Sequence, residues 1–234
     1  QIIVYFFGRR QQLVFLKTVW VILWKDLVTE WRNRQTFSAM LVFALMVIFL
    51  FNFALELNRG VQAVVASGVI WVTLAFCGTL GFNRSLSAEQ DRGCLDGLLL
   101  APVNRGAIFV GKALSNLVFM LATAIVVLPV YSLLYNTNLF VPAFLLVILL
   151  GLLGYAALGT MLSGMSMRSR MRDLLLPVLL FPVALPLLVA VVKASGGLLE
   201  GQPLSAVRHW MDLLVVYDII FLTVSLVVFD YVIE

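Results

Sequence analysis

One run of residues in this 234-residue sequence has nearly the types and spacing of a phosphate-binding loop. Gly106-Ala-Ile-Phe-Val-Gly111-Lys112 resembles the glycine-rich motif whose backbone amides and lysine hold a nucleotide. That motif needs a Ser or Thr after the lysine to bind Mg²⁺, and here the residue is Ala113. The run also opens an apolar stretch of helical length instead of following a strand. We therefore interpret Lys112 as a helical residue whose ammonium reaches the membrane interface, and we expect no ATP hydrolysis by this chain.

Other residues that could do chemistry stand alone in apolar surroundings. Asp218 lies within an apolar stretch, where an ionisable side chain is costly and often functional. It could pair with a neighbouring helix or line a polar cleft. The single histidine, His209, adjoins Trp210, which favours an interfacial role over haem ligation. No catalytic triad or metal-ligand spacing accompanies these residues, so we predict no catalytic residue, no directly bound cofactor and no metal site.

Composition identifies the solvent that surrounds most of the chain. Hydrophobic residues make up 62% and charged residues 12%, against about 45–50% and about 25% in soluble domains. A soluble domain of this size has too little interior to hide so much apolar surface. Most of the chain must therefore contact lipid. In a membrane protein, basic residues mostly set the orientation of the spans, so the net charge of +4 does not indicate nucleic-acid binding.

Six apolar stretches are each long enough for a helix to cross about 30 Å of hydrocarbon. They are continuous and do not alternate, which favours helices over barrel strands. They cover Phe37–Leu55, Val61–Phe82, Gly106–Tyr135, Leu139–Met167, Leu174–Val192 and Met211–Val232. We therefore predict an all-α membrane protein in which residues 37–234 form a domain of six transmembrane helices.

Lysine and arginine are distributed unequally between the two sides of this predicted bundle. Of the 16 such residues, all but Arg59, Lys193 and Arg208 lie on one side, before the first span or around the second and fourth connections. Basic residues are retained in the cytoplasm. Both termini are therefore predicted to be cytoplasmic.

Residues 1–36 precede the first span and contain an amphipathic segment. An apolar stripe recurs there at steps of three and four residues, as on one face of a helix. It consists of Leu13, Leu16, Trp20, Leu23, Leu27 and Trp31. Tryptophans beside basic residues are typical of a helix at the membrane interface, whereas a seventh crossing from Val19 to Leu27 is too short. The predicted interfacial residues are Trp20, Trp24, Lys25, Trp31 and Arg32.

The second connection, residues 83–105, is longer than a turn between two spans requires. It combines carboxylates with a cluster of leucines, and an exposed apolar patch beside charges commonly marks an interaction site. A loop that folds back onto the bilayer is an equally good interpretation of these residues alone. The candidate contact residues are Leu86, Glu89, Asp91, Gly93, Leu95, Asp96, Leu98 and Pro102.

Several runs of this sequence resemble the CcmB family, the permease subunits of the ABC transporter for cytochrome c maturation. The resemblance covers nearly the whole chain after about Gln11, and residues 93–102 are its most specific part. Family members often carry Phe-x-x-Asp in the second connection, where this chain has Leu86-Ser-Ala-Glu89. The matching runs are Trp24–Arg34, Gly78–Ser85, Gly93–Val103, Ile108–Lys112, Leu174–Pro182 and Asp218–Leu222.

The resemblance implies an ABC-2-like permease in a bacterial inner membrane. Two copies would pair with two copies of a separate CcmA-like ATPase, which binds the ATP and docks on residues 86–102. We therefore refer to residues 83–105 as the coupling segment. The implied complex also contains a haem-handling CcmC-like membrane protein and a small CcmD-like subunit, and it serves a CcmE-like haem chaperone. Haem would be a handled substrate, either exported or released with its chaperone.

Other functions are compatible with the residues alone. An ABC-2 permease could carry another substrate, such as a lipid or a polysaccharide. A scaffold could hold partners while nothing crosses the membrane. An intramembrane enzyme is the least supported, because Asp218 would be its single candidate residue.

Overall fold

The computed structural model describes residues 2–55, 59–91, 104–135, 137–166, 169 and 171–232. Within these ranges the chain forms helices joined by short connections, with no strand. Six of the helices are long and apolar enough to cross a membrane, which confirms the predicted all-α membrane fold. The helices are α1 (Ile2–Asn33), α2 (Gln35–Leu55), α3 (Arg59–Asp91), α5 (Arg105–Tyr135), α6 (Pro142–Ser166), α7 (Arg172–Leu199) and α8 (Leu204–Val232).

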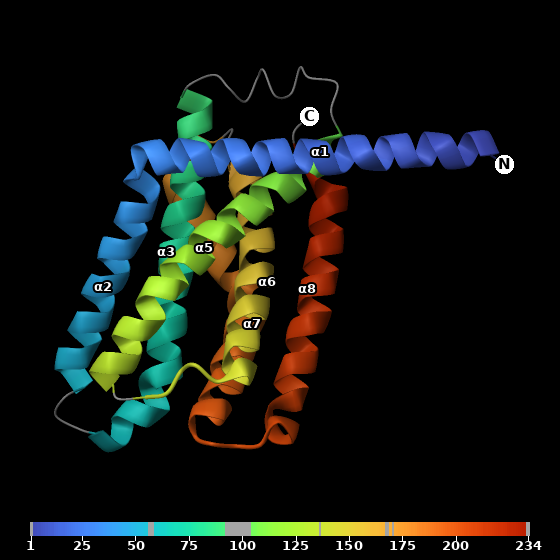
Figure 1. Cartoon of the computed structure of the whole chain (residues 1–234). Helices are drawn as coiled ribbons and strands as arrows, with labels where there is room; N and C mark the ends of the chain where they lie inside the picture. Colours follow the sequence, from blue (N-terminus) through green and yellow to red (C-terminus); the bar gives the residue numbers. More distant parts are fainter. Residues whose placement is uncertain are drawn as a thin grey trace.

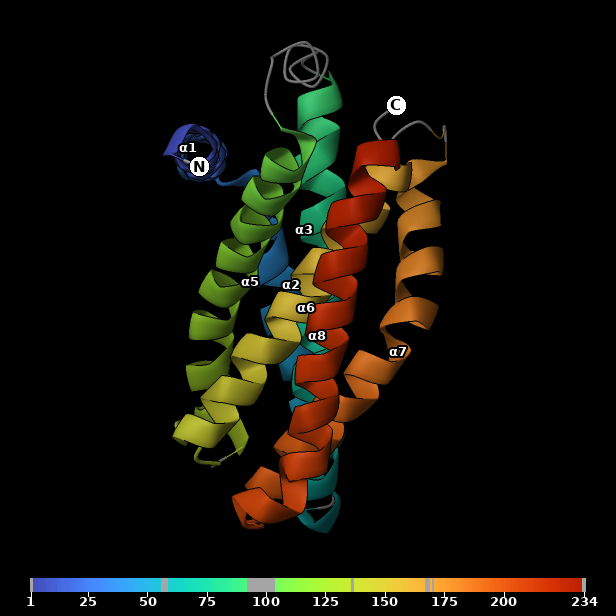
Figure 2. The same cartoon turned by 90° about the vertical axis from the view of Figure 1, so that its right-hand side faces the viewer.

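Helix α1 lies across one end of the bundle, whereas the six apolar helices run between its two ends (Figure 1). The beginning of α5 and the end of α8 lie at the end that carries α1. The last turns of α3 project past the level of α1 in both views (Figures 1 and 2). An element that lies across the spans, with a helix end projecting beyond it, is the arrangement expected for an interfacial helix.

Several helices extend further than the apolar stretches that reveal them. The predicted last span begins at Met211, but α8 begins at Leu204 and includes Arg208, which lies 3.8 Å from Asp212 one turn later. Helix α3 likewise continues to Asp91, so the first part of the coupling segment is helical. Hydropathy measures where a helix leaves the hydrocarbon, and a helix does not need to end there.

The core forms around α6, which contacts its neighbours through glycines. A Cβ atom built on Gly159 would overlap the ring of Phe82 on α3, and one on Gly151 would overlap Trp71. Ser163, one turn after Gly159, donates a hydrogen bond to the Phe82 carbonyl at 3.4 Å. These small residues allow α6 and α3 to approach each other closely.

Buried hydrogen bonds join α3 to three other helices. Trp71 donates its indole N–H to Ser195 of α7 at 2.9 Å, and Tyr155 of α6 donates to the Ala75 carbonyl at 3.0 Å. Tyr131 of α5 donates to the Ala66 carbonyl at 3.2 Å. Since such bonds are strong where water is excluded, they hold α3, α5, α6 and α7 together.

Helix α7 contains three prolines and changes direction along its length (Figure 2). Pro177, Pro182 and Pro186 each remove a backbone donor from the helical ladder. Next to Pro182, the Val183 carbonyl accepts a hydrogen bond from Tyr217 of α8 at 3.0 Å. The bend in α7 is thus attributable to its prolines, and α8 bonds to the bent region.

Candidate functional site

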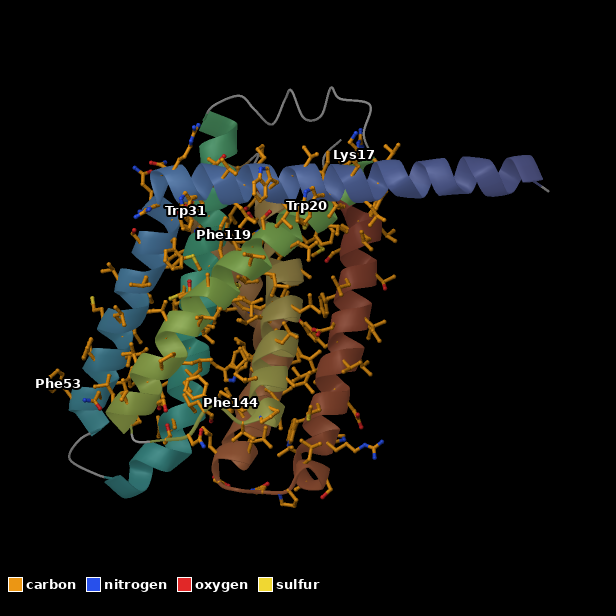
Figure 3. The ribbon with its side chains drawn as sticks, in the orientation of Figure 1. Lys17, Trp20, Trp31, Phe53, Phe119 and Phe144 are labelled. Carbon is orange, nitrogen blue, oxygen red and sulfur yellow. The ribbon has the colours of Figure 1, made fainter. Side chains whose placement is uncertain are left out.

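Helix α1 presents different residues to the bundle and to its surroundings. Val19 and Ile22 are buried against the spans, whereas Trp20, Trp24 and Trp31 are exposed. Trp20 and Trp31 point along the spans and Lys17 points the opposite way (Figure 3). An interfacial helix would have this distribution, with its tryptophans towards lipid and its lysine away from it. The interfacial role of these residues remains a prediction. Lys25 is partly exposed and Arg32 is exposed.

Part of the predicted apolar stripe of α1 is exposed and does not pack on the bundle. Leu16 and Trp20 of that stripe are 63% and 62% exposed, whereas Val19 and Ile22 are 8% and 4% exposed. Both sets have helical spacing. A sequence pattern does not distinguish an apolar face that meets lipid from one that meets protein, because both faces avoid water.

Helix α1 packs on the first turns of α5 at a glycine. A Cβ built on Gly111 would lie 2.9 Å from the Cβ of Ile22 and 3.3 Å from the carbonyl oxygen of Val19. These distances are too short for ordinary contacts. The missing side chain of Gly111 therefore allows α1 to rest against the backbone of α5.

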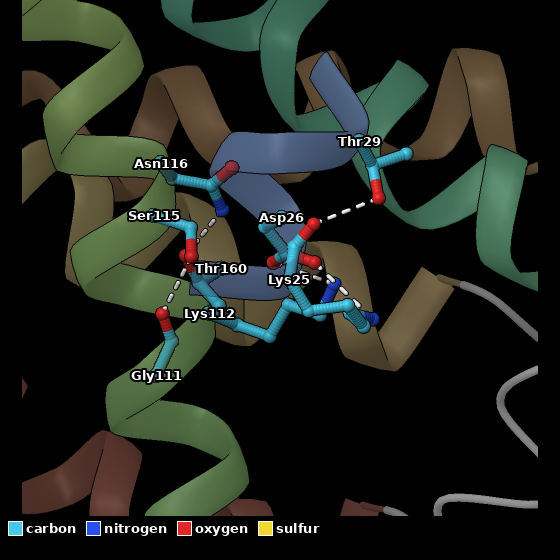
Figure 4. Close-up of polar contacts among 8 residues, drawn as sticks. All are labelled: Lys25, Asp26, Thr29, Gly111, Lys112, Ser115, Asn116 and Thr160. Carbon is cyan, nitrogen blue, oxygen red and sulfur yellow. Dashed lines mark hydrogen bonds and ion pairs between the residues drawn. The ribbon is translucent and has the colours of Figure 1, made fainter. Parts of the chain in front are cut away.

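A buried ion pair lies beside this glycine (Figure 4). The Lys112 Nζ atom is 2.9 Å from the Asp26 Oδ2 atom, and the two residues are 3% and 8% exposed. Lys25 approaches the other Asp26 oxygen at 3.2 Å, and its side chain is 41% exposed. Our prediction that the Lys112 ammonium reaches the membrane interface is therefore wrong, because the side chain is buried. It is held inside the contact between α1 and α5 by a carboxylate from a distant part of the chain.

Polar contacts continue from this pair towards α6 (Figure 4). One turn after Lys112, Asn116 donates its side-chain amide to the Thr160 hydroxyl at 2.9 Å. Ser115 donates to the Gly111 carbonyl at 2.8 Å. The same stretch of α5 is therefore joined to α1 by charge and to α6 by a hydrogen bond.

The corner between α1 and α2 is also defined by polar contacts. Arg34 adopts a φ of 51°, which turns the chain from α1 into α2. Glu30 accepts a hydrogen bond from the Phe37 amide at 2.7 Å and so caps the start of α2. Arg84 of α3 donates to the Gln35 carbonyl at 3.2 Å. The end of α1 is thereby held against the beginning of the spans.

The run that resembles a phosphate-binding loop is helical. Gly106, Gly111 and Lys112 lie in the first turns of α5. Asn104 precedes them and accepts a hydrogen bond from the Gly106 amide at 2.8 Å, as an N-cap does. The helical interpretation of this run is confirmed, and its lysine binds a carboxylate within the chain.

Three of the eight predicted coupling residues lie in the described part of the backbone. Leu86, Glu89 and Asp91 belong to the last turns of α3, although their side chains lie outside the described part of the structure. The remaining five lie outside the described residues altogether: Gly93, Leu95, Asp96, Leu98 and Pro102. Their contact role remains a prediction.

Asp218 lies in the middle of α8, further from the helix end than its predicted span implies, because α8 begins at Leu204. The residue is 4% exposed, and neither carboxyl oxygen has a hydrogen-bond partner among the described residues. A Cβ built on Gly154 of α6 would overlap Oδ1 and lie 3.0 Å from Leu187 of α7. Asp218 thus packs against α6 at Gly154, and among the described residues it does not form the polar pair that we considered.

His209 is exposed beside Trp210, and their ring centroids are 5.7 Å apart. In the described ranges, no three His, Cys, Asp or Glu side chains are grouped so that they could hold a metal ion.

Together these features define a multi-pass helical membrane protein whose first helix packs across the end of six spans. The model of the CcmB protein family matches residues 17–232, so the chain belongs to the CcmB family. It is similar to the protein named heme exporter protein B of Rhodobacter capsulatus, with 27% identity over 188 residues. That similarity covers 77% of this chain and 85% of the relative.

Proposed function

We propose that this chain is the permease subunit of an ABC transporter that handles haem during cytochrome c maturation, and that a separate CcmA-like ATPase drives it. Its membership of the CcmB family and the name of its Rhodobacter relative support this proposal. The observation that carries it is the projection of α3 past α1, which gives a soluble ATPase a helix to contact outside the bilayer (Figure 1).

The end of the bundle that carries α1 is the side we assign to the cytoplasm of a bacterial inner membrane. Lys25, Arg34, Arg84 and Arg105 belong to this end, whereas Arg208 belongs to the opposite one. Basic residues favour the cytoplasmic side. With this orientation, Leu86, Glu89 and Asp91 of α3 would extend towards a cytoplasmic ATPase, and residues 93–102 would complete the contact.

In the proposed complex this chain converts ATP hydrolysis by its partner into rearrangement of its spans. A second copy of the chain, a CcmC-like haem-handling protein and a small CcmD-like subunit would complete the membrane part. The cycle would export haem or release the haem-loaded CcmE-like chaperone. This chain would supply the moving helices, with no bound cofactor of its own.

Deletion of the gene for this chain tests the proposal. We expect loss of covalently haem-loaded cytochrome c, recovery when the chain is restored, and co-purification of an ATPase with the restored protein. Unchanged cytochrome c maturation would contradict the proposed function. If an ATPase still co-purified, that result would indicate a permease for another substrate, such as a lipid or a polysaccharide. Spans that do not rearrange between nucleotide-bound and empty complexes would indicate a scaffold.

The Glu89→Lys variant tests the docking site. A reversed charge at a complementary contact should weaken binding, and we expect about tenfold less ATPase to co-purify. Glu200→Lys is a matched control, because Glu200 is exposed at the opposite end of the bundle. Equal recovery of the ATPase with both variants would contradict the assignment of Glu89.

A further inference from the structure

We propose that Asp26 and Lys112 are positioning residues that make α1 and the first turns of α5 move as one unit. We call this the α1–α5 unit, and its contact consists of Val19, Ile22 and Asp26 on α1 with Gly111 and Lys112 on α5. This inference rests on the proposed function, since it states how a movement of the coupling segment reaches the spans.

Stability does not explain why this contact contains a buried ion pair. Both side chains are more than nine-tenths buried, so both lose most of their hydration. Such desolvation commonly cancels the attraction between the charges, and an apolar pair of similar volume is often as stable or more stable. The best-attested advantage of a buried polar pair is that it selects one arrangement among several of similar energy.

The geometry of the contact selects one register and one rotation of α1. Asp26 follows Ile22 by four residues and therefore lies one turn along the same face. Ile22 rests on Gly111, while Asp26 meets the adjacent Lys112. A rotation of α1 by one residue turns its side chains by about 100° and separates the charges. Apolar attraction is not directional, so the ion pair adds an orientational preference to the close fit of Ile22 on Gly111.

The α1–α5 unit lies close to the point where the coupling segment enters the bundle. Lys112 is seven residues after Arg105, the first residue of α5, which corresponds to about 10 Å along the helix. The first proline inside α5 is Pro129, so its backbone ladder has no proline break up to Asn116. A displacement at the start of α5 therefore reaches α1 through the ion pair and α6 through the bond from Asn116 to Thr160.

The decisive variant replaces both charges by apolar side chains of similar size, Asp26→Leu with Lys112→Met. We expect this protein to assemble with its ATPase and to hydrolyse ATP within about twofold of the wild type. We expect the yield of haem-loaded cytochrome c to fall by roughly tenfold, a typical coupling effect between distant sites. The measurements are ATPase co-purification, ATP hydrolysis by the whole complex, and cytochrome c yield in cells. Lys25→Met is the control, because it removes the partly exposed neighbour of Asp26 and keeps the buried pair.

Two results would overturn the inference. A full yield of cytochrome c from the apolar pair would show that the charges do not position α1. Failure of the apolar pair to assemble would show that the charges serve stability instead. The proposed function is judged separately by deletion of the chain. If deletion abolishes cytochrome c maturation while the apolar pair remains fully active, this inference fails and the proposed function stands.

Discussion

Two buried aspartates in this bundle have opposite surroundings. Asp26, 8% exposed, lies where α1 crosses the end of the spans, and lysines approach both of its oxygens. The Asp26 Oδ2 atom makes no hydrogen bond of good geometry, but it lies 2.9 Å from the Lys112 ammonium. Asp218, 4% exposed, lies in the middle of a span, and among the described residues its oxygens have no hydrogen-bond partner. The carboxyl group of Asp26 is thus bound by oppositely charged side chains, whereas that of Asp218 is only packed against Gly154.

The difference follows from what the neighbouring helices can offer. Helix α5 brings Lys112 to the contact with α1. Helix α6 has no charged residue in its sequence, and it meets Asp218 with Gly154, which offers space without a donor. An unsatisfied buried polar group costs about 1–3 kcal/mol. Removal of Lys112 should therefore destabilise the protein, because it leaves the Asp26 carboxylate buried without its main partner. The Asp218 carboxyl, in contrast, should itself lower the stability of the bundle.

The largest effect should come from breaking the pair on one side only. Lys112→Met leaves the Asp26 carboxylate buried beside the partly exposed Lys25. Removal of one member of a buried pair commonly costs about 3–5 kcal/mol, and we expect a loss near the lower end of that range. Chemical unfolding of the purified protein in detergent measures it. The apolar pair at positions 26 and 112 should recover most of the loss, and an equal loss in that variant would contradict an electrostatic origin.

A smaller effect should follow from filling the space beside Asp218. Gly154→Ala places a methyl group against the carboxyl oxygen and close to Leu187, so α6 and α8 must separate slightly. Overpacking of this kind costs about 1–3 kcal/mol, and the same unfolding measurement applies. Gly68→Ala is the matched control, since no atom lies within 4 Å of a Cβ built there. A loss of stability in Gly68→Ala as large as that in Gly154→Ala would show that the contact with Asp218 is not the cause.

The sequence predicts the six spans well because hydrophobicity is a local property. It predicts less about the ends of the helices, since Arg208 lies outside the predicted apolar stretch but inside α8. The central position of Asp218 in its helix was missed for that reason.

The pairing of Asp26 with Lys112 was missed for a different reason. It joins residues far apart in the chain, and no local pattern connects them. A signal was present, since an acidic residue interrupts the interfacial segment and a lysine lies inside an apolar stretch after a glycine. Opposite charges in apolar stretches are candidates for each other, because burial of either one alone is costly.

The smallest effect, and the one of opposite sign, should come from removing the Asp218 carboxyl. Asp218→Val deletes both oxygens and supplies an apolar side chain to an apolar junction, so we expect a gain of about 1 kcal/mol in the free energy of unfolding. Asp218→Val should raise the free energy of unfolding of the purified protein, whereas Lys112→Met should lower it. The two aspartates would then differ in the sign of their effect on stability. A loss of stability would show that the carboxyl forms a stabilising interaction in the bundle. If stability rises while the yield of haem-loaded cytochrome c falls, Asp218 serves the transport cycle at the expense of packing. Unchanged yield in Asp218→Val would leave an intramembrane enzyme without its candidate residue.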